Sequence, residues 1–135
     1  CKPAPTTADF HTQFGVFCEE VGETLKEVSA ANRETALLIV EAQEAMERLG
    51  THLKGNDEVI VIKQQHRKDF LDGLNDVIVT AVTTAHTQAM DIVGSANEVN
   101  RANYSKFVDG NPIFDANGKV AKGPDYQKAD LTPFV

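Results

Sequence analysis

Three carboxylates stand close together near the start of the chain, within the segment Phe14-Gly-Val-Phe-Cys-Glu-Glu-Val-Gly-Glu23. On a helix, Glu20 and Glu23 share one face, and Glu19 lies about 100° around from it. Carboxylates placed so close repel one another and resist desolvation unless a cation lies between them. The spacing is therefore compatible with a divalent metal site, and also with the solvated acidic edge of a surface helix.

A second acidic row occurs further along the chain. Asp72 and Asp76 are four residues apart and share a helical face, and Asp69 extends the row by one turn. If the two acidic helices pack side by side, their carboxylates would face one another and form a site made only of oxygen ligands. Mg²⁺ and Mn²⁺ favour such ligands, and a hard divalent ion held there would in turn bind phosphate oxygens.

The acidic segments resemble a known family. Glu19-Glu20-Val-Gly-Glu23 is similar to the EExxE helix of the MazG-like, all-α nucleoside triphosphate pyrophosphohydrolases. The second acidic motif of that family is ExxD on a later helix. Asp76 matches its final Asp, but Gly73 occupies the Glu position. Asp72, one residue earlier, would face the same way and is the expected substitute.

Three further segments resemble the phage and bacterial members of this family. Phe10-His11 with Phe14-Gly15 resembles their FHxxFG opening. Residues 98–106, with the sequence EVNRANYSK, resemble EVxRxNxSK, and residues 115–126 resemble the DGKVxKGPxY tail. With the acidic motif, four segments occur in the family's order and cover about half of the chain.

The resemblance implies hydrolysis of a nucleoside triphosphate to the monophosphate and pyrophosphate, with Mg²⁺ or Mn²⁺ as cofactor. It implies that Glu20, Glu23, Asp72 and Asp76 bind the metal. Glu19 would orient or deprotonate the attacking water. It also implies a homodimer or homotetramer, in which the site forms where subunits meet.

The same resemblance implies a set of substrate-binding residues. Lys106 and Lys122 would stabilise negative charge on the leaving pyrophosphate, and Asn103 would hydrogen-bond the sugar or base. Arg101 and His11 complete the set. A lone basic residue on a short helix is usually only solvated, and a histidine near a helix start is usually partly buried at the surface.

A rival acidic pair lies on the second predicted helix. Glu41 and Glu44 also form an ExxE pair, and their separation from Asp76 is closer to the family's usual spacing. Val40 occupies the place of the first Glu, whereas the Glu19-Glu20 pair is complete. The sequence therefore favours the first acidic helix without excluding the second.

The periodicity of apolar residues predicts an all-α fold, a four-to-five-helix bundle of the all-α NTP pyrophosphohydrolase type. We expect one domain over residues 1–135, with a loose lead over residues 1–7 and an irregular tail over residues 108–135. The tail would contain a small β-hairpin across residues 115–118. The expected helices span residues 8–30, 32–53, 67–90 and 95–107.

The sequence also predicts local details of the helices and of the segments that join them. Thr7 or Asp9 should cap the first helix, whose buried stripe would include Phe14, Phe17, Cys18, Val21, Leu25 and Val28. Close approach by a neighbour would explain Gly22, and Gly94 should separate the last two helices. The second helix should be well buried or lie at a subunit interface. The apolar run Val59–Ile62 should be a packed connector rather than a strand.

Composition limits the function. The formal net charge of −7 argues against a protein that binds nucleic acid by attraction to phosphates, and an acidic protein that handles nucleotides needs a metal ion to reverse the local charge. The sequence contains no run of about 18 apolar residues, so it predicts no membrane span. Two cysteines give no disulfide framework, so we expect a cytoplasmic protein, in the bacterial host if it is phage-encoded.

Two other classes compete with the enzyme. The first is a non-catalytic helical interaction module of phage or bacterial origin, in which the acids are surface features. The second is a di-iron bundle, which needs Glu-x-x-His pairs on two helices. Neither Glu20 and Glu23 nor Glu41 and Glu44 has a histidine three residues later, which argues against di-iron.

Overall fold

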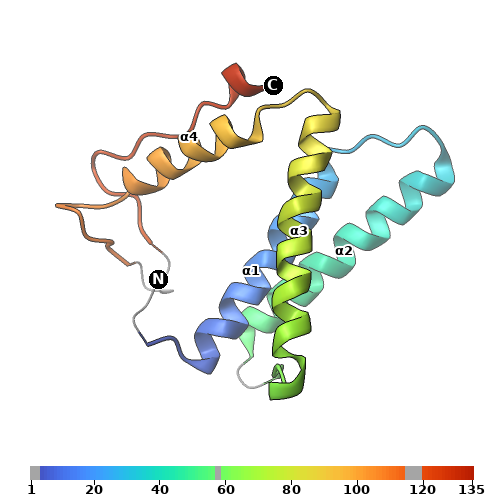
Figure 1. The fold of residues 1–135 in the computed structure, drawn as a ribbon, viewed down its shortest axis with the longest axis horizontal. Helices are drawn as coiled ribbons and strands as arrows, with labels where there is room; N and C mark the ends of the chain where they lie inside the picture. Colours follow the sequence, from blue (N-terminus) through green and yellow to red (C-terminus); the bar gives the residue numbers. More distant parts are fainter. Residues whose placement is uncertain (1–3, 57–58, 115–119) are drawn as a thin grey trace. The chain divides into compact units, whose positions relative to one another are not determined.

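The described part of the chain is helical. The computed structural model describes residues 4–56, 59–114 and 120–135, and contains in them four α-helices and no strand. Figure 1 shows their order along the chain. The expected all-α class is confirmed. The chain divides into two compact units, an N-terminal unit of Cys1–Gln64 and a C-terminal unit of Gln65–Val135.

The N-terminal unit consists of helices α1, Thr7–Lys26, and α2, Arg33–Gly55. Thr6, rather than Thr7 or Asp9, is the N-cap of α1. Its hydroxyl accepts from the Asp9 N–H, while the Asp9 carboxylate accepts from the Thr6 N–H at 2.7 Å, which completes a capping box. Helix α1 ends four residues earlier than expected, because the Glu27 N–H bonds to carbonyls of the preceding turn and the chain then leads to Asn32, the N-cap of α2.

Helices α1 and α2 pack along each other through small residues (Figure 1). The buried residues of α1 are His11, Gly15, Cys18 and Gly22. A Cβ built on Gly15 would lie 2.8 Å from the Gly50 carbonyl oxygen, so the two backbones are in contact. A Cβ on Gly22 would lie 3.4 Å from Met46 Cβ, which confirms the close neighbour expected there.

The expected apolar stripe of α1 is only partly the buried one. Cys18 is buried, but Phe14 and Phe17 are half-buried, and Val28 is exposed. The phenyl rings of Phe10, Phe14 and Phe17 stack in a row beside the α2 contact, with centroids 5.9 and 5.8 Å apart. The prediction was wrong about the centre of the interface, because glycine allows closer helix approach than a large apolar side chain does.

Helix α2 is not well buried within the described residues of one chain, which leaves the expected subunit interface as a prediction. Only Gly50 and Leu53 of α2 are buried, and Leu38 is 59% exposed. After α2, residues 59–62 form a connector with no strand pairing among the described residues, as expected. The connector is not packed along its whole length, because Val59 and Val61 are exposed.

The C-terminal unit contains η1, Gln64–His66, which begins at the unit boundary, α3, Arg67–Thr87, α4, Ile92–Tyr104, and η2, Thr132–Phe134. Gly94 does not separate the helices. It lies in the first turn of α4, because Asp91 is the N-cap and its carboxylate accepts from the Gly94 N–H at 2.9 Å. A Cβ on Gly94 would lie 2.7 Å from the Phe134 ring, so the glycine lets the C-terminal segment pack against α4.

The tail after α4 is irregular, as expected. The Asp109-Gly110 turn is present: Val108 and Asn111 exchange two backbone hydrogen bonds of 2.9 Å around it, and both turn residues have positive φ. One backbone bridge joins Phe114 to Val120, while the expected hairpin turn lies outside the described residues. No helix in the described ranges has the length and apolar character needed to cross a membrane.

Candidate functional site

The acidic motif of α1 is divided between two faces of the helix. Glu19 lies at the contact with α2, where its Oε2 accepts a hydrogen bond from Lys54 Nζ at 2.6 Å, and its other oxygen also contacts this ammonium. Both side chains are 26% exposed. Glu20 and Glu23 are exposed, and among the described residues neither carboxylate has an ion pair or a hydrogen bond.

The glycines of the α1–α2 contact place Glu19 there. A Cβ on Gly50 would lie 2.6 Å from Glu19 Cγ and 2.7 Å from the Gly15 carbonyl oxygen. With about 100° per residue, Glu20 lies almost opposite the buried glycine face of α1. Glu19 therefore joins the two helices, while Glu20 and Glu23 remain available to a ligand.

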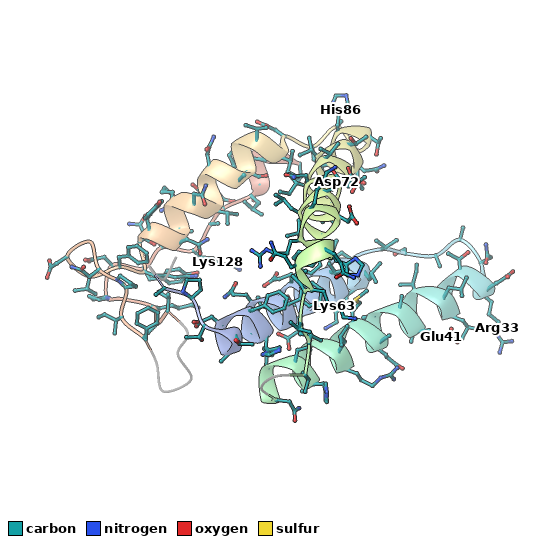
Figure 2. All side chains as sticks on the ribbon, turned by 60° about the horizontal axis from the view of Figure 1, so that its bottom comes forward. Arg33, Glu41, Lys63, Asp72, His86 and Lys128 are labelled. Atoms are coloured by element: carbon teal, nitrogen blue, oxygen red, sulfur yellow. The ribbon has the colours of Figure 1, made fainter. Side chains whose placement is uncertain are left out.

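The acids of α3 form an exposed row. Asp69, Asp72 and Asp76 are all exposed, and within the described ranges their side chains make no ion pair. At about 100° per residue, Asp72 and Asp76 lie opposite Leu74 and Ala85, which with Phe70 are the partly buried residues of α3. Asp72 is labelled on α3 in Figure 2.

The rival acids of α2 are also exposed. Glu41 extends from the side of α2 away from α1 (Figure 2) and has no ion pair in the described part of the chain. Glu44 lies 3.8 Å from Arg48 one turn later. A further acid, Glu47, bonds Lys26 of α1 at 2.6 Å. This hydrogen bond lowers the pKa of the Glu47 carboxyl and raises that of the Lys26 ammonium.

The donor chemistry of these acids suits a hard divalent cation, since each pair offers only carboxylate oxygens. Within residues 4–56, 59–114 and 120–135, no three His, Cys, Asp or Glu side chains are grouped closely enough to bind a metal ion.

His11 and Cys18 are enclosed in the N-terminal unit. His11 is 1% exposed, and its Nε2 lies 2.9 Å from the Ile60 carbonyl oxygen and 3.2 Å from the Ile60 nitrogen. The ring therefore fixes the connector to α1, and a contact with nucleotide would require this arrangement to open. Burial, and secondarily the charge of Glu19, raises the pKa of the Cys18 thiol, as expected for an unreactive core cysteine.

Arg101 binds other parts of the C-terminal unit. Its Nε and Nη2 donate to the two Glu98 oxygens at 2.7 Å, Nη1 donates to the Gln127 side chain at 3.0 Å, and Nη2 also approaches the Lys128 carbonyl oxygen at 3.3 Å. Glu98 Oε1 accepts from the Asp130 N–H at 3.0 Å. The pKa of Glu98 is lowered to about 2, mainly by the hydrogen bonds from the Arg101 guanidinium and secondly by the hydrogen bond from the Asp130 N–H.

The other predicted substrate residues lie around a groove. The groove has a volume of about 680 Å³ and runs between α4 and the C-terminal segment. Asn103 lines it, and Lys106 Nζ donates to Asn103 Oδ1 at 2.8 Å. Lys122 Nζ lies 4.8 Å from the ring centroid of Tyr126, which also lines the groove.

Sequence reasoning missed Lys54, Glu98 and Tyr126 as important residues. Lys54 is 35 residues from its partner Glu19, so no local pattern identifies the pair. Glu98 and Tyr126 both occur in the family-like segments, but their types alone do not indicate these contacts.

Compared with models of protein families, with curated proteins and with solved structures, the chain matches none.

Proposed function

We propose that the protein is a Mg²⁺-dependent nucleoside triphosphate pyrophosphohydrolase. One observation supports this most directly: α1 and α3 each present a pair of exposed carboxylates, at spacings of three and four residues, that make no ion pair within the described chain. Glu23 interacts with the Lys26 ammonium only through its charge, because that ammonium is bonded to Glu47. The paired acids elsewhere, Glu19, Glu47 and Glu98, are already bound to Lys54, Lys26 and Arg101. Carboxylates left free of such partners are available to a metal ion.

In the proposed reaction, the oxygen of a water molecule forms a bond to the α-phosphorus, and the bond from that phosphorus to the bridging oxygen breaks. The proton lost by the water passes to a base, for which Glu19 is the candidate. Nucleoside monophosphate and pyrophosphate are released. Glu20, Glu23, Asp72 and Asp76 are the residues that would hold Mg²⁺, and the ion would supply neutralisation of phosphate charge. Lys106 and Lys122 stabilise the leaving pyrophosphate, and Asn103 hydrogen-bonds the nucleoside.

The test is incubation of the full chain with Mg²⁺ and each common ribo- and deoxyribonucleoside triphosphate, followed by measurement of pyrophosphate and monophosphate. We expect release in equal amounts from at least one substrate. Glu20→Gln and Asp76→Asn should each reduce the rate by about 100-fold or more, as loss of a metal-positioned transition state does. Full activity in both variants would reject these ligands.

The rival acids are compared in the same assay. Glu41→Gln tests the α2 set, and Glu34→Gln, another exposed Glu on α2, is its matched control. Our proposal expects both variants to retain wild-type activity. Loss of activity in Glu41→Gln alone would move the metal ligands from α1 to α2 while keeping the reaction.

A non-catalytic interaction module is the second candidate, and the exposed apolar residues of α2 and α3 favour it. Leu38 is 59% exposed, and Leu71 and Ile78 are 61% and 62% exposed. Such residues are typical of surfaces that are covered by another polypeptide. Absence of pyrophosphate with every substrate and with both Mg²⁺ and Mn²⁺ would favour this candidate.

We also propose a homodimer or homotetramer, which would cover these apolar residues. Sedimentation equilibrium of the wild type and of Leu38→Glu tests this. The exposed position of Leu38 lets the charged residue be accommodated in the monomer, so the variant should remain folded but dissociate. A monomeric wild type at micromolar concentration would contradict the oligomer.

A further inference from the structure

The groove of the C-terminal unit has the features of a small-molecule site. It is an open groove with a volume of about 680 Å³, and its lining residues Val99, Leu131 and Val135 are exposed. Its apolar part consists of side chains from both α4 and the C-terminal segment: Val99, Ala102, Ala129, Leu131 and Val135. The other lining residues carry polar or charged groups: Asn103, Tyr126, Lys128, Asp130 and Thr132. A lining of apolar side chains together with polar groups fits an organic ligand better than a hydrated ion.

The residues around this groove favour an aromatic and anionic ligand. The Tyr126 ring is half-buried in its wall. Lys128 lines the groove, Lys106 bonds the lining residue Asn103, and Lys122 lies over Tyr126. Three ammonium groups thus occur around one groove of a chain with a net charge of −7. The opposing lining charge is Asp130, whose carboxylate already accepts from the Thr132 N–H at 3.0 Å.

One wall of the groove depends on the Glu98–Arg101 pair. Arg101 contacts Gln127 and the Lys128 carbonyl, and Glu98 accepts from the Asp130 N–H. The Ser105 hydroxyl accepts from the Gln127 N–H at 2.9 Å at the next turn of α4. Residues 127–130 are therefore fixed to α4 on the side where Tyr126 and Lys128 line the groove. All three guanidinium nitrogens are engaged in these contacts.

We propose that this groove binds the nucleoside end of the substrate nucleotide, with the base against Tyr126 and the first phosphate at Lys128, and that Glu98 and Arg101 are positioning residues that hold its wall. The identification of the ligand as the substrate rests on the proposed function. The groove itself is identified by its aromatic ring, apolar lining and lysines. Arg101 acts through the segment it binds, and not by contact with phosphate.

The first experiment measures binding by calorimetry to the full chain, without metal, using the four deoxynucleoside monophosphates and inorganic pyrophosphate as probes. Tyr126→Leu should weaken the best monophosphate by about tenfold, as loss of one base–aromatic contact does. Tyr104→Leu is the matched control, because Tyr104 is on α4 but does not line the groove, and it should bind as the wild type does. Equal affinities in all three proteins, or binding of pyrophosphate alone, would overturn the proposal.

The second experiment separates positioning from direct phosphate contact at Arg101. Arg101→Gln should weaken a nucleoside and its monophosphate by the same factor, because it loosens the wall that contacts the base. Lys128→Gln should weaken only the monophosphate. An Arg101→Gln loss restricted to ligands with a phosphate would overturn the positioning role. Circular dichroism of each variant checks that α4 remains folded, and Glu98→Gln provides an independent change to the same wall.

The experiments distinguish a wrong proposal for the enzyme activity from a wrong proposal for nucleoside binding in the groove. If no triphosphate is hydrolysed but nucleotide binding depends on Tyr126, the enzyme proposal fails and the groove stands as a binding site. If pyrophosphate is released and Tyr126→Leu leaves KM unchanged, the reaction stands and the groove is not its nucleoside site. If the proposed reaction and the proposed groove site are both correct, Glu20→Gln should bind nucleotide without metal as the wild type does but release no pyrophosphate.

Discussion

Substituting Gly50 by alanine should destabilise the N-terminal unit, although alanine favours helix. A Cβ at this position would lie 2.7 Å from the Gly15 carbonyl oxygen and 2.6 Å from Glu19 Cγ. The first neighbour is backbone, and the second belongs to a side chain held by Lys54, so neither moves freely. Overpacking a methyl group costs about 1–3 kcal/mol, and two such contacts place the cost near ~3 kcal/mol.

The net change in the free energy of unfolding is the overpacking cost minus the gain from alanine's helix preference. Alanine gains about 1 kcal/mol over glycine in a helix interior, which leaves Gly50→Ala less stable by about 2 kcal/mol. For a chain of this size, that lowers Tm by about 8 °C. Urea unfolding followed by far-ultraviolet circular dichroism measures the change, with thermal unfolding as a second measure.

Gly73→Ala is the matched control in another helix. Nothing in the described chain lies within 4 Å of a Cβ built there, so only the helix preference applies, and we expect a gain of about 0.5–1 kcal/mol. The two glycine-to-alanine changes should therefore have opposite signs. A Gly50→Ala protein as stable as the wild type would show that the backbones of α1 and α2 are further apart than described.

Three further predictions concern single side chains. The pKa of Glu98 is lowered from 4.5 to about 2, so its contribution to stability is present above pH 4.5 and is lost as the pH falls toward 2; Glu98→Gln should flatten that part of an acid-unfolding curve, and an unchanged curve would contradict the pairing. Cys18 is buried and its thiol pKa is raised, so in a Cys1→Ser background a thiol reagent at pH ~8 should label it only after denaturant is added, and rapid native labelling would refute its burial. His11→Phe should lower the free energy of unfolding by about 1–3 kcal/mol, because the backbone N–H and carbonyl of Ile60 lose their partner. Chemical unfolding at neutral pH measures this loss, and an unchanged free energy of unfolding would contradict the importance of the contact.

The sequence was sufficient for the number and approximate bounds of the helices, because apolar periodicity and capping residues are local signals. It was not sufficient for the contact face of α1. His11, Gly15, Cys18 and Gly22 follow helical spacing as the phenylalanines do, but small and polar residues give a weaker apolar pattern. Which of two adjacent faces is buried depends on the partner helix, and Gly50 is the residue that decides it.

The candidate site shows the same limit. The local spacing of the acids was readable from the sequence, since i,i+3 and i,i+4 pairs share a face. The use of Glu19 was not, because its partner Lys54 is on another helix. Likewise, Arg101 was expected at the substrate, whereas its described contacts are with Glu98, Gln127 and Lys128. Basic side chains in a motif-like segment do not reveal whether they bind a ligand or the chain itself.

The ion pair of Glu19 affects the choice between the two acidic helices. The complete double Glu was the feature that favoured α1 over α2, yet both Glu19 oxygens contact the Lys54 ammonium. If Glu19 only joins the helices, Glu20 and Glu23 form an ExxE pair equivalent to Glu41 and Glu44, and the advantage of α1 disappears. If Glu19 activates water, it must release Lys54 during the reaction.

A double-mutant cycle distinguishes these roles of Glu19. For a joining role, Glu19→Gln, Lys54→Met and the double variant should have similar stability losses, with a coupling of about 1 kcal/mol, and activity should follow the folded fraction. For a role in activating water, Lys54→Met retains activity in its folded fraction, whereas Glu19→Gln loses it. If fully folded Glu19→Gln retains activity, Glu19 does not activate water. The role of the Glu19–Lys54 pair is then only to join α1 to α2.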